Sequence, residues 1–310
     1  MDPAISLQGV TKSFGPTSAV RDLDLSIPKG ALYGFIGPNG AGKTTSLRMI
    51  MSILFPDRGS IAVLGCPSAW EAKDRIGYLP EERGVYRKMK VGAFLTYIAR
   101  LKGVNDADPS GRIKSWLDRV ELQNVYDKKC EELSKGMLQK VQLVAAVLHQ
   151  PELLILDEPF SGLDPVSMRL LRELVLAEHR RGATILFSTH IMLQAEELCE
   201  HIVMLHRGRK VLDESLDSIR RSHVPRAVLF EPFDPAADVV PLGGVEGVAS
   251  VIRNGGGYRL DLTPAADPVR TIRAIALAVA PSRIELQRPS LEDIFVDLVT
   301  DEAEPAGISA

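Results

Sequence analysis

The residues best suited to chemistry form a glycine-rich stretch in the N-terminal part of the chain. The sequence GPNGAGKTT, from Gly37 to Thr45, matches the pattern G-x-x-x-x-G-K-[ST] in full. Glycines let backbone N–H groups turn toward phosphate oxygens, and a following helix adds the positive end of its dipole. In such a loop the lysine, here Lys43, reaches the outer phosphates, and the hydroxyl of Thr44 binds Mg²⁺. The stretch therefore predicts a binding site for a nucleoside triphosphate.

Two acidic residues follow an apolar run in the sequence LLILDEP, residues 153–159. The apolar run predicts a buried strand, and ligands of an open α/β sheet lie at the carboxyl ends of its strands. We therefore expect Asp157 to hold Mg²⁺, directly or through water, and Glu158 to take a proton from an attacking water molecule. The simpler alternative is a pair of solvated acids that end a strand.

The elements that must position these residues alternate along the first 220 or so residues between apolar runs and helix-like patterns. This alternation predicts a parallel sheet with crossover helices. The expected strands are residues 32–37, 153–157 and 183–189, and the expected helices are residues 43–54 and 165–182. The pattern from about residue 85 to 150 is mostly helical and predicts a helical insert.

The pattern changes after Pro225, where short alternating strands begin. The expected elements are strands at 226–231, 247–253, 258–263 and 284–287 and helices at 268–280 and 290–299. The turn NGGG joins two of the strands, and Ser290 is a suitable N-cap for the last helix. We therefore expect a first domain at 1–222, a small α+β domain at 225–300 and a disordered tail at 301–310.

The overall composition fits a globular protein with one main and one smaller domain. The chain has 310 residues, of which 45% are hydrophobic and 25% are charged. A net charge of -3 creates no field that would recruit nucleic acid, and three scattered cysteines favour a reducing compartment. No apolar run approaches the roughly 18–20 residues that span a bilayer, so we expect any work at a membrane to go through a partner.

Three shorter motifs accompany the phosphate loop and LLILDEP: LSKGM at 133–137, SGLDP at 161–165 and STH at 188–190. Each of them alone is also compatible with an ordinary turn or a capping histidine. In this order and spacing, however, the five motifs resemble the ATP-binding cassette (ABC) family of transport ATPases over about residues 4–220. The resemblance implies an α/β phosphate-loop NTPase (RecA-like) core with a helical subdomain and an antiparallel N-terminal β region.

The resemblance also implies a set of site residues. Those expected to bind ATP are Phe14, which would stack on adenine, and Gly37, Pro38, Asn39, Gly40, Ala41, Gly42, Lys43, Thr44, Thr45, Ser134, Gly136 and Asp164. Those expected around Mg²⁺ are Thr44, Glu81 and Asp157. Glu158 is the expected general base, and His190 is expected to sense or stabilise the γ-phosphate.

Members of this family work as head-to-tail dimers, in which the signature loop (here LSKGM, residues 133–137) caps the nucleotide held by the other subunit. The chemistry suits that role, because Ser134 offers a hydroxyl, Gly136 an unhindered N–H and the following helix a dipole. We therefore expect an ATP-dependent homodimer that hydrolysis loosens. The further expected partner is an integral membrane permease of about six spans, with the chain cytoplasmic and peripheral on the inner face of the cell membrane.

The sequence departs from the family pattern in places. The family has Gly where Lys135 stands, Gln where Met137 stands, and a metal-touching Gln where Glu81 stands. A carboxylate still suits a hard cation, although Glu81 could instead be a solvated loop acid beside Glu82. Phe14 as a core residue is likewise an open alternative.

The sequences GYLPEERGVYRKMKV and RPSLEDIFVDLV resemble the ATPases of ABC-2-type exporters, the sodium and drug efflux group, which share a small C-terminal domain. The apolar residues of SLEDIF are equally compatible with the packing face of a helix. We expect an ATP-hydrolysing subunit that drives a separate exporter permease, with no nucleic-acid partner. The alternatives are a soluble ABC protein that clamps nucleic acid or ribosomes, and a small-molecule kinase, which would not explain LSKGM.

Overall fold

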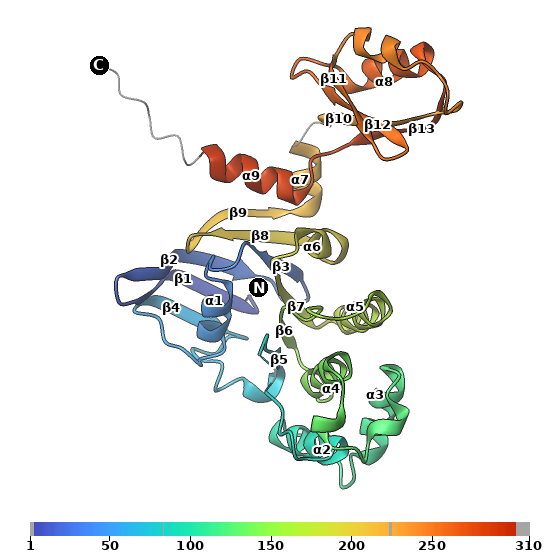
Figure 1. Cartoon of the computed structure of the whole chain (residues 1–310). Coiled ribbons are helices and arrows are strands. Elements are labelled where there is room, and N and C mark those ends of the chain that lie inside the picture. Colours follow the sequence, from blue (N-terminus) through green and yellow to red (C-terminus); the bar gives the residue numbers. More distant parts are fainter. Residues whose placement is uncertain (1–2, 83, 223–224, 302–310) are drawn as a thin grey trace. The chain divides into compact units, whose positions relative to one another are not determined.

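The computed structural model describes residues 3–82, 84–222 and 225–301 (Figure 1). The chain divides into two compact units, the first ending at Leu216 and the second beginning at Asp217. The predicted end of the first domain, residue 222, is the last residue of α7 (Leu216–Ser222). Apart from Asp301, the tail that we expected to be disordered lies outside the described residues.

Within the part of the chain that the structure describes, a six-stranded sheet forms the centre of the first unit, in the order β5-β6-β7-β3-β8-β9. Its neighbouring strands are parallel, except that β9 runs antiparallel to β8. The strands are β3 (Leu32–Ile36), β5 (Ile76–Leu79), β6 (Leu153–Asp157), β7 (Thr184–Thr189), β8 (His201–His206) and β9 (Arg209–Ser215). Every residue of β3, β6 and β7 is buried, as expected for strands that are covered on both faces.

Helices cover one face of this sheet, and a smaller sheet with α1 covers the other (Figure 1). The helices are α4 (Lys135–Val147), α5 (Pro165–Arg180) and α6 (Met192–Leu198). The smaller sheet is antiparallel, in the order β2-β1-β4, with β1 at Ile5–Phe14, β2 at Thr17–Ile27 and β4 at Arg58–Val63. Its apolar side chains share a core with those of the central sheet, which includes Leu7, Phe35 and Ile155. This arrangement confirms the predicted α/β core and antiparallel N-terminal region.

The chain between β5 and β6 is largely helical. It contains α2 (Val91–Leu101), α3 (Ser110–Arg119) and α4, with short 3₁₀ turns at Gln123–Val125 and Cys130–Glu132. A further 3₁₀ turn, Lys73–Arg75, leads into β5. The segment corresponds to the helical insert that we expected at about 85–150, and α4 returns from it to pack on the central sheet beside β5.

The strand register brings the predicted site residues to one edge of the central sheet. Ile36, the last residue of β3, pairs with Thr189 at the end of β7, and Ser188 pairs with Asp157 at the end of β6. Because these strands are parallel, the loops that leave their carboxyl ends start side by side. The phosphate loop, Glu158 and His190 therefore leave the sheet at the same edge.

The helix α1 (Lys43–Ile50) is shorter than the predicted helix at 43–54. The helical pattern stops because Ser52 has a φ of 55°, in the left-handed region, and the next N–H groups turn back to the carbonyl of Arg48. Apolar periodicity continued past this point in the sequence, so periodicity alone could not locate the end of the helix. Among the residues that the structure covers, no helix has both the length and the apolar character needed to cross a membrane.

The second unit contains an antiparallel sheet in the order β11-β12-β10-β13. Its elements are β10 (Ala227–Pro232), a 3₁₀ turn (Val240–Gly244), β11 (Val248–Asn254), β12 (Gly257–Leu262), α8 (Pro268–Ala278), β13 (Pro281–Gln287) and α9 (Leu291–Asp301). Asn254 pairs with Gly257 across the NGGG turn, and Ser290 accepts the N–H of Asp293 at 3.1 Å as a helix cap. The small α+β fold expected after residue 225 is present.

Glycine at position 77 allows α4 to pack closely on β5. A Cβ atom at Gly77 would lie 2.2 Å from the carbonyl oxygen of Ala146 in α4 and 2.9 Å from Cδ1 of Leu154. The first of these neighbours is a backbone atom, which cannot turn aside as a side chain does. The helix α4, whose first turn contains Lys135, Gly136 and Met137 of the signature loop, can therefore pack this closely on β5 because residue 77 has no side chain.

We predict that Gly77→Ala lowers the free energy of unfolding by about 1–3 kcal/mol, because α4 must shift to admit the methyl group. Denaturant titration of the nucleotide-free protein measures the change. The matched control is Gly111→Ala in α3, where a Cβ would meet nothing within 4 Å. This control should be neutral or slightly stabilising, since alanine favours a helix. Equal stabilities of Gly77→Ala and wild type would contradict the prediction.

Candidate active site

The phosphate loop lies between β3 and α1 and has a shape that glycine permits. Gly37 and Gly42 have φ values of 150° and 105°, which L-residues rarely adopt. A Cβ at Gly37 would lie 2.3 Å from the carbonyl oxygen of Leu205, and one at Gly42 would lie 2.4 Å from that of Ala19. The loop is therefore fixed by close backbone neighbours on both sides. Gly42 is also the N-cap of α1, whose first N–H groups have no partner within the helix.

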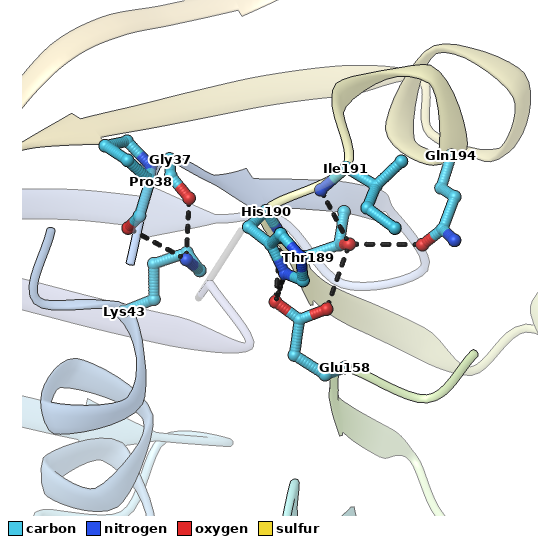
Figure 2. Close-up of polar contacts among 8 residues, drawn as sticks. All are labelled: Gly37, Pro38, Lys43, Glu158, Thr189, His190, Ile191 and Gln194. Atoms are coloured by element: carbon cyan, nitrogen blue, oxygen red, sulfur yellow. Dashed lines mark hydrogen bonds and ion pairs between the residues drawn. The ribbon is translucent and has the colours of Figure 1, made fainter. Parts of the chain in front are cut away.

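The ammonium group of Lys43 lies inside the loop. Its Nζ donates to the carbonyl oxygen of Gly37 at 2.6 Å and to that of Pro38 at 3.2 Å (Figure 2). The side chain is buried, and burial lowers the pKa of Lys43, whereas the charges of Glu158, Asp157 and Glu81 oppose this shift. A buried cation that faces several acids is placed to bind an anionic group that enters the loop.

A pocket of about 430 Å³ connects the predicted elements of the site. Its lining consists of Phe14, Ala19, Asn39, Gly40, Gly42, Lys43, Thr44, Thr45, Glu81 and Glu158. The volume lies in the range of pockets that hold small-molecule ligands and cofactors. The structure thus brings the aromatic residue, most of the phosphate loop and two of the predicted acids around one cavity.

Phe14 ends β1 and forms part of this pocket wall. Its side chain is 50% exposed, which excludes the alternative that it is a core residue. The Nζ atom of Lys12 lies 5.7 Å from the centre of the ring, within the range of a cation–π contact. An exposed aromatic face at the rim of a pocket is suited to stacking on a planar ligand.

Asp157, the last residue of β6, carries a buried carboxylate with unmet hydrogen-bonding capacity. The residue is 0% exposed, and burial, with the charges of Glu81 and Glu158, raises its pKa from 3.8 to about 6. The hydroxyls of Ser188 and Thr44 moderate this shift. Within the described residues, however, neither carboxylate oxygen has a hydrogen-bond partner of normal geometry, and neither does Oγ of Ser188. Buried oxygen atoms of this kind call for a ligand.

Two adjacent acids follow β5, and they have different surroundings. Glu81 lines the pocket, whereas Glu82 forms an ion pair with Arg48 of α1 at 3.4 Å. The ambiguity between the two acids in the sequence is therefore resolved in favour of Glu81 as the acid that faces the cavity. Both residues are exposed, so Glu81 lies at the open side of the pocket, unlike the fully buried Asp157.

The oxygen donors around the pocket fit a magnesium ion that arrives with a nucleotide. Nowhere among residues 3–82, 84–222 and 225–301 do three or more His, Cys, Asp or Glu side chains gather to hold a metal by themselves. Magnesium in nucleotide sites normally needs only one or two carboxylates, with phosphates and water completing its shell. The orphaned oxygens of Asp157, with Thr44 and Glu81 nearby, match that requirement.

Glu158 has an unusual backbone and a tightly held carboxylate. Its φ of 49° lies in the left-handed region, and its N–H donates to the carbonyl of Ser188 at 3.0 Å. Oε1 accepts from the backbone N–H of His190 at 2.8 Å and from Nδ1 of the same residue at 2.7 Å (Figure 2). Oε2 accepts from the hydroxyl of Thr189 at 3.1 Å. Strained conformations of this kind concentrate at functional sites.

These contacts determine which atoms are free to react. A carboxylate oxygen has about two lone-pair positions. Among the described residues, Oε1 of Glu158 accepts two hydrogen bonds and Oε2 accepts one, so Oε2 has one lone-pair position left. Because an ionised carboxylate has no proton to give, Nδ1 of His190 must carry the proton of the hydrogen bond that joins them. Nε2 of His190 is then the ring nitrogen available to a ligand, and Oε2 of Glu158 is the oxygen available to accept a proton.

Sequence reasoning missed several residues of this network. The Thr189 hydroxyl also accepts from the N–H of Ile191 and contacts Oε1 of Gln194 in α6, both at 3.1 Å (Figure 2). The signal for Thr189 was available, because it directly precedes His190 and ends a strand next to β6. Nothing in the sequence indicated Gln194, whose contact depends on how α6 begins.

Six predicted nucleotide ligands are absent from the lining of this pocket, and three of them belong to the phosphate loop. Ser134 is the N-cap of α4 and accepts from the N–H of Met137 at 3.3 Å, with Gly136 in the same turn. Asp164 is the N-cap of α5 and accepts from the N–H groups of Val166 and Ser167, which hold its pKa below the usual range. Of the phosphate loop, Gly37 and Pro38 offer carbonyls to Lys43, and Ala41 is buried. The nucleotide contacts of Ser134, Gly136 and Asp164 stay predictions.

Comparison with known protein families agrees with this geometry. Residues 20–161 match the family described as ABC transporter. Residues 215–299 match the C-terminal domain of a family described as ATP-binding protein DrrA1-3-like. The two matches fall almost entirely in the two different units of the chain.

Known relatives and solved structures extend the agreement to nearly the whole chain. The ABC transporter ATP-binding protein YhaQ of Bacillus subtilis is 44% identical over 95% of this chain and 98% of its own length. Nod factor export ATP-binding protein I of a Rhizobium species is 34% identical, over 97% of this chain and 98% of its own length. NatA of Bacillus subtilis is 40% identical, over 66% of this chain and 85% of its own length. A solved ATP-binding subunit of an ABC transporter superposes with a TM-score of 0.66 at 32% identity, covering 71% of this chain and 92% of that one.

The pocket with its phosphate loop, the buried acid that ends β6 and these relatives lead to one assignment. The chain belongs to the ATP-binding proteins of ABC transporters.

Proposed function

We propose that this chain binds MgATP in the pocket beside the phosphate loop and hydrolyses it to drive a separate membrane permease. The observation that carries the proposal is the pocket itself, which is lined by Phe14, the phosphate loop, Glu81 and Glu158. An aromatic face, a cradle for phosphates and an acid able to activate water are the three parts that ATP hydrolysis needs.

The nucleotide would extend from Phe14 to the phosphate loop. The adenine ring stacks on Phe14, and the backbone N–H groups at the start of α1 face the phosphate oxygens. Lys43 donates to the outer phosphates in place of the carbonyls that it now contacts. Asp157, Thr44 and Glu81 would hold Mg²⁺, which would offset the negative charge of the phosphates.

The groups that act on the attacking water are Glu158 and His190. Oε2 of Glu158, with its free lone-pair position, accepts the proton of a water molecule aligned with the terminal phosphate. His190 fixes Oε1 through two hydrogen bonds, so the carboxylate cannot rotate away from that water. Nε2 of His190 is left to contact the terminal phosphate.

The signature loop would act on the ATP of a second copy of the chain. Ser134 and Gly136 do not line the pocket of their own chain, which supports a contact across a head-to-tail dimer. Ser134 already caps α4, so its hydroxyl stands at a helix N-terminus suited to an anion. Because the loop contacts the terminal phosphate, loss of that phosphate weakens the dimer.

The relatives support an export system as the setting. One of them is a Nod factor export ATP-binding protein, and others are ABC transporter ATP-binding proteins. We propose that the chain works at the inner face of the cell membrane, bound to a permease of about six spans. The most direct test is reconstitution with a candidate permease of about six spans, with ATP-dependent export as the expected activity.

We predict that Glu158→Gln retains ATP binding and lowers the turnover number by at least about 100-fold, because the amide cannot accept the proton of water. Phosphate release measured in the steady state gives the turnover number, and calorimetry gives the affinity for ATP. The control is Glu82→Gln, which removes the acid next to Glu81 that pairs with Arg48 and does not line the pocket. Phosphate release by Glu158→Gln near the wild-type rate would remove Glu158 from its role.

We predict that Asp157→Asn stabilises the nucleotide-free protein above pH 6. The raised pKa of about 6 means that folding must bury an anion once the pH exceeds that value. The carboxyl therefore costs no stability below about pH 4 and costs up to about 3 kcal/mol near pH 8. Thermal unfolding with a chelator present should show the gain at pH 8 and not at pH 4, whereas MgATP should stabilise wild type more than the variant. Lower stability of the variant at pH 8 would contradict this account.

We predict that Ser134→Arg, added to Glu158→Gln, abolishes the ATP-induced dimer, because the larger side chain occupies the place of the partner's terminal phosphate. Monomers should still bind ATP through Lys43. Size-exclusion chromatography with ATP and calorimetry of the monomer measure the two effects. Ser110→Arg, at the start of α3, is the control, and it should dimerise normally. If monomer affinity falls as well, the signature loop touches the ATP of its own chain.

A further inference from the structure

The turn that follows Glu158 is attached to the helix that carries the signature loop. Nε2 of Gln139, in the second turn of α4, donates to the carbonyl oxygen of Pro159 at 3.1 Å. Gln139 is 2% exposed, so this hydrogen bond is shielded from water. One turn earlier the helix also approaches this segment, since a Cβ added at Gly136 would lie 3.5 Å from Cδ2 of Leu163. The start of α4 therefore lies directly on the segment 158–164.

The turn at Glu158 needs external support because its backbone is strained. A φ of 49° is unfavourable for a residue other than glycine and persists only where surrounding contacts enforce it. Two backbone hydrogen bonds hold the turn, from Glu158 N–H to Ser188 at 3.0 Å and from Ser161 N–H to Glu158 at 3.1 Å. The first ties it to β7 and the second closes it on itself. The bond from Gln139 attaches it to α4.

The hydrogen bond of Gln139 sets it apart from a second buried glutamine on the same helix. Gln142 is also buried, at 6% exposure, yet its amide oxygen has no hydrogen-bond partner among the described residues. The helix thus carries two buried glutamines, and one of them is joined to the catalytic turn. Since a buried hydrogen bond is costly to leave unmade, the Pro159 carbonyl follows the position of Gln139.

We propose that Gln139 is a positioning residue, which links the signature helix α4 to the carboxylate of Glu158. The inference rests on the proposed function, in which Glu158 activates water and the signature loop contacts a second nucleotide. A displacement of α4 then reaches Glu158 through one side chain and one peptide group. The same chain that caps its partner's ATP thereby adjusts the general base for its own ATP.

The proposal has a consequence for kinetics that a purely structural role does not have. Without the Gln139 donor, the turn at Glu158 loses its tie to α4, and the carboxylate departs from the position that aligns water. Displacements of about 1 Å at a reacting group lower rates by as much as about 100-fold. Gln139 is not among the residues that line the pocket, so we expect the affinity for ATP to be unchanged.

The test compares Gln139→Met with Gln142→Met in the full-length chain. Methionine is close in size to glutamine and has no N–H to donate. We expect Gln139→Met to lower the turnover number at least about tenfold with KM for ATP unchanged, and Gln142→Met to stay within about twofold of wild type. Equal turnover of the two variants, whether both high or both low, would overturn the proposal. So would a fall in turnover of Gln139→Met that is matched by a rise in KM.

Two further measurements separate this result from unfolding and from failure of the proposed function. Thermal unfolding shows whether Gln139→Met is folded, and Gln139→Leu, which is similar in size and has no hydrogen-bond donor, should show the same loss of turnover. With Glu158→Gln added, Gln139→Met should still form the ATP-induced dimer, because the signature loop itself is intact. If wild type does not hydrolyse ATP, the proposed function fails. If wild type hydrolyses ATP and Gln139→Leu does so equally well, only the role of Gln139 fails.

Discussion

The parallel register of β6, β7 and β3 is the constraint on which the candidate site depends. Pairing of Asp157 with Ser188 and of Ile36 with Thr189 makes three strands end at one edge of the sheet. Each loop that leaves this edge begins with a residue of the site, so the phosphate loop, the acids and the histidine meet although the sequence separates them widely. A shift of one strand by one residue would turn its side chains to the opposite face of the sheet, and the residues of the pocket would no longer lie together.

The balance of charges at this edge of the sheet determines which ligands it suits. Asp157, Glu158 and Glu81 are set against a single buried ammonium group, that of Lys43. Burial, helped by the neighbouring acids, raises the pKa of Asp157, and the same acids oppose the fall in the pKa of Lys43 that burial causes. A divalent cation would relieve this imbalance, and the loop that faces it has the shape and charge to take a phosphate chain. Metal and nucleotide are therefore complementary to the site only as a pair.

Much of the site was predictable because its motifs are local. The phosphate loop needs glycines within one turn, and an acid that ends an apolar strand needs no distant residue to be recognised, so Lys43, Asp157 and Glu158 could be found from sequence alone. The contacts of Gln139, Thr189 and Gln194 depend on how helices from distant segments lie on the sheet. Local backbone conformation was equally hidden, as the early end of α1 at the left-handed Ser52 shows.

The contact of Lys43 with the carbonyls of Gly37 and Pro38 bears on how the site empties. A buried ammonium group that lost its only anionic partner would be left without a hydrogen-bond acceptor, at a cost of several kcal/mol. Here the loop supplies two acceptors of its own, so departure of a phosphate returns the lysine to a satisfied position. After release of product, the Lys43 ammonium group would therefore still have two hydrogen-bond acceptors, and the loop would not need to rearrange to supply them.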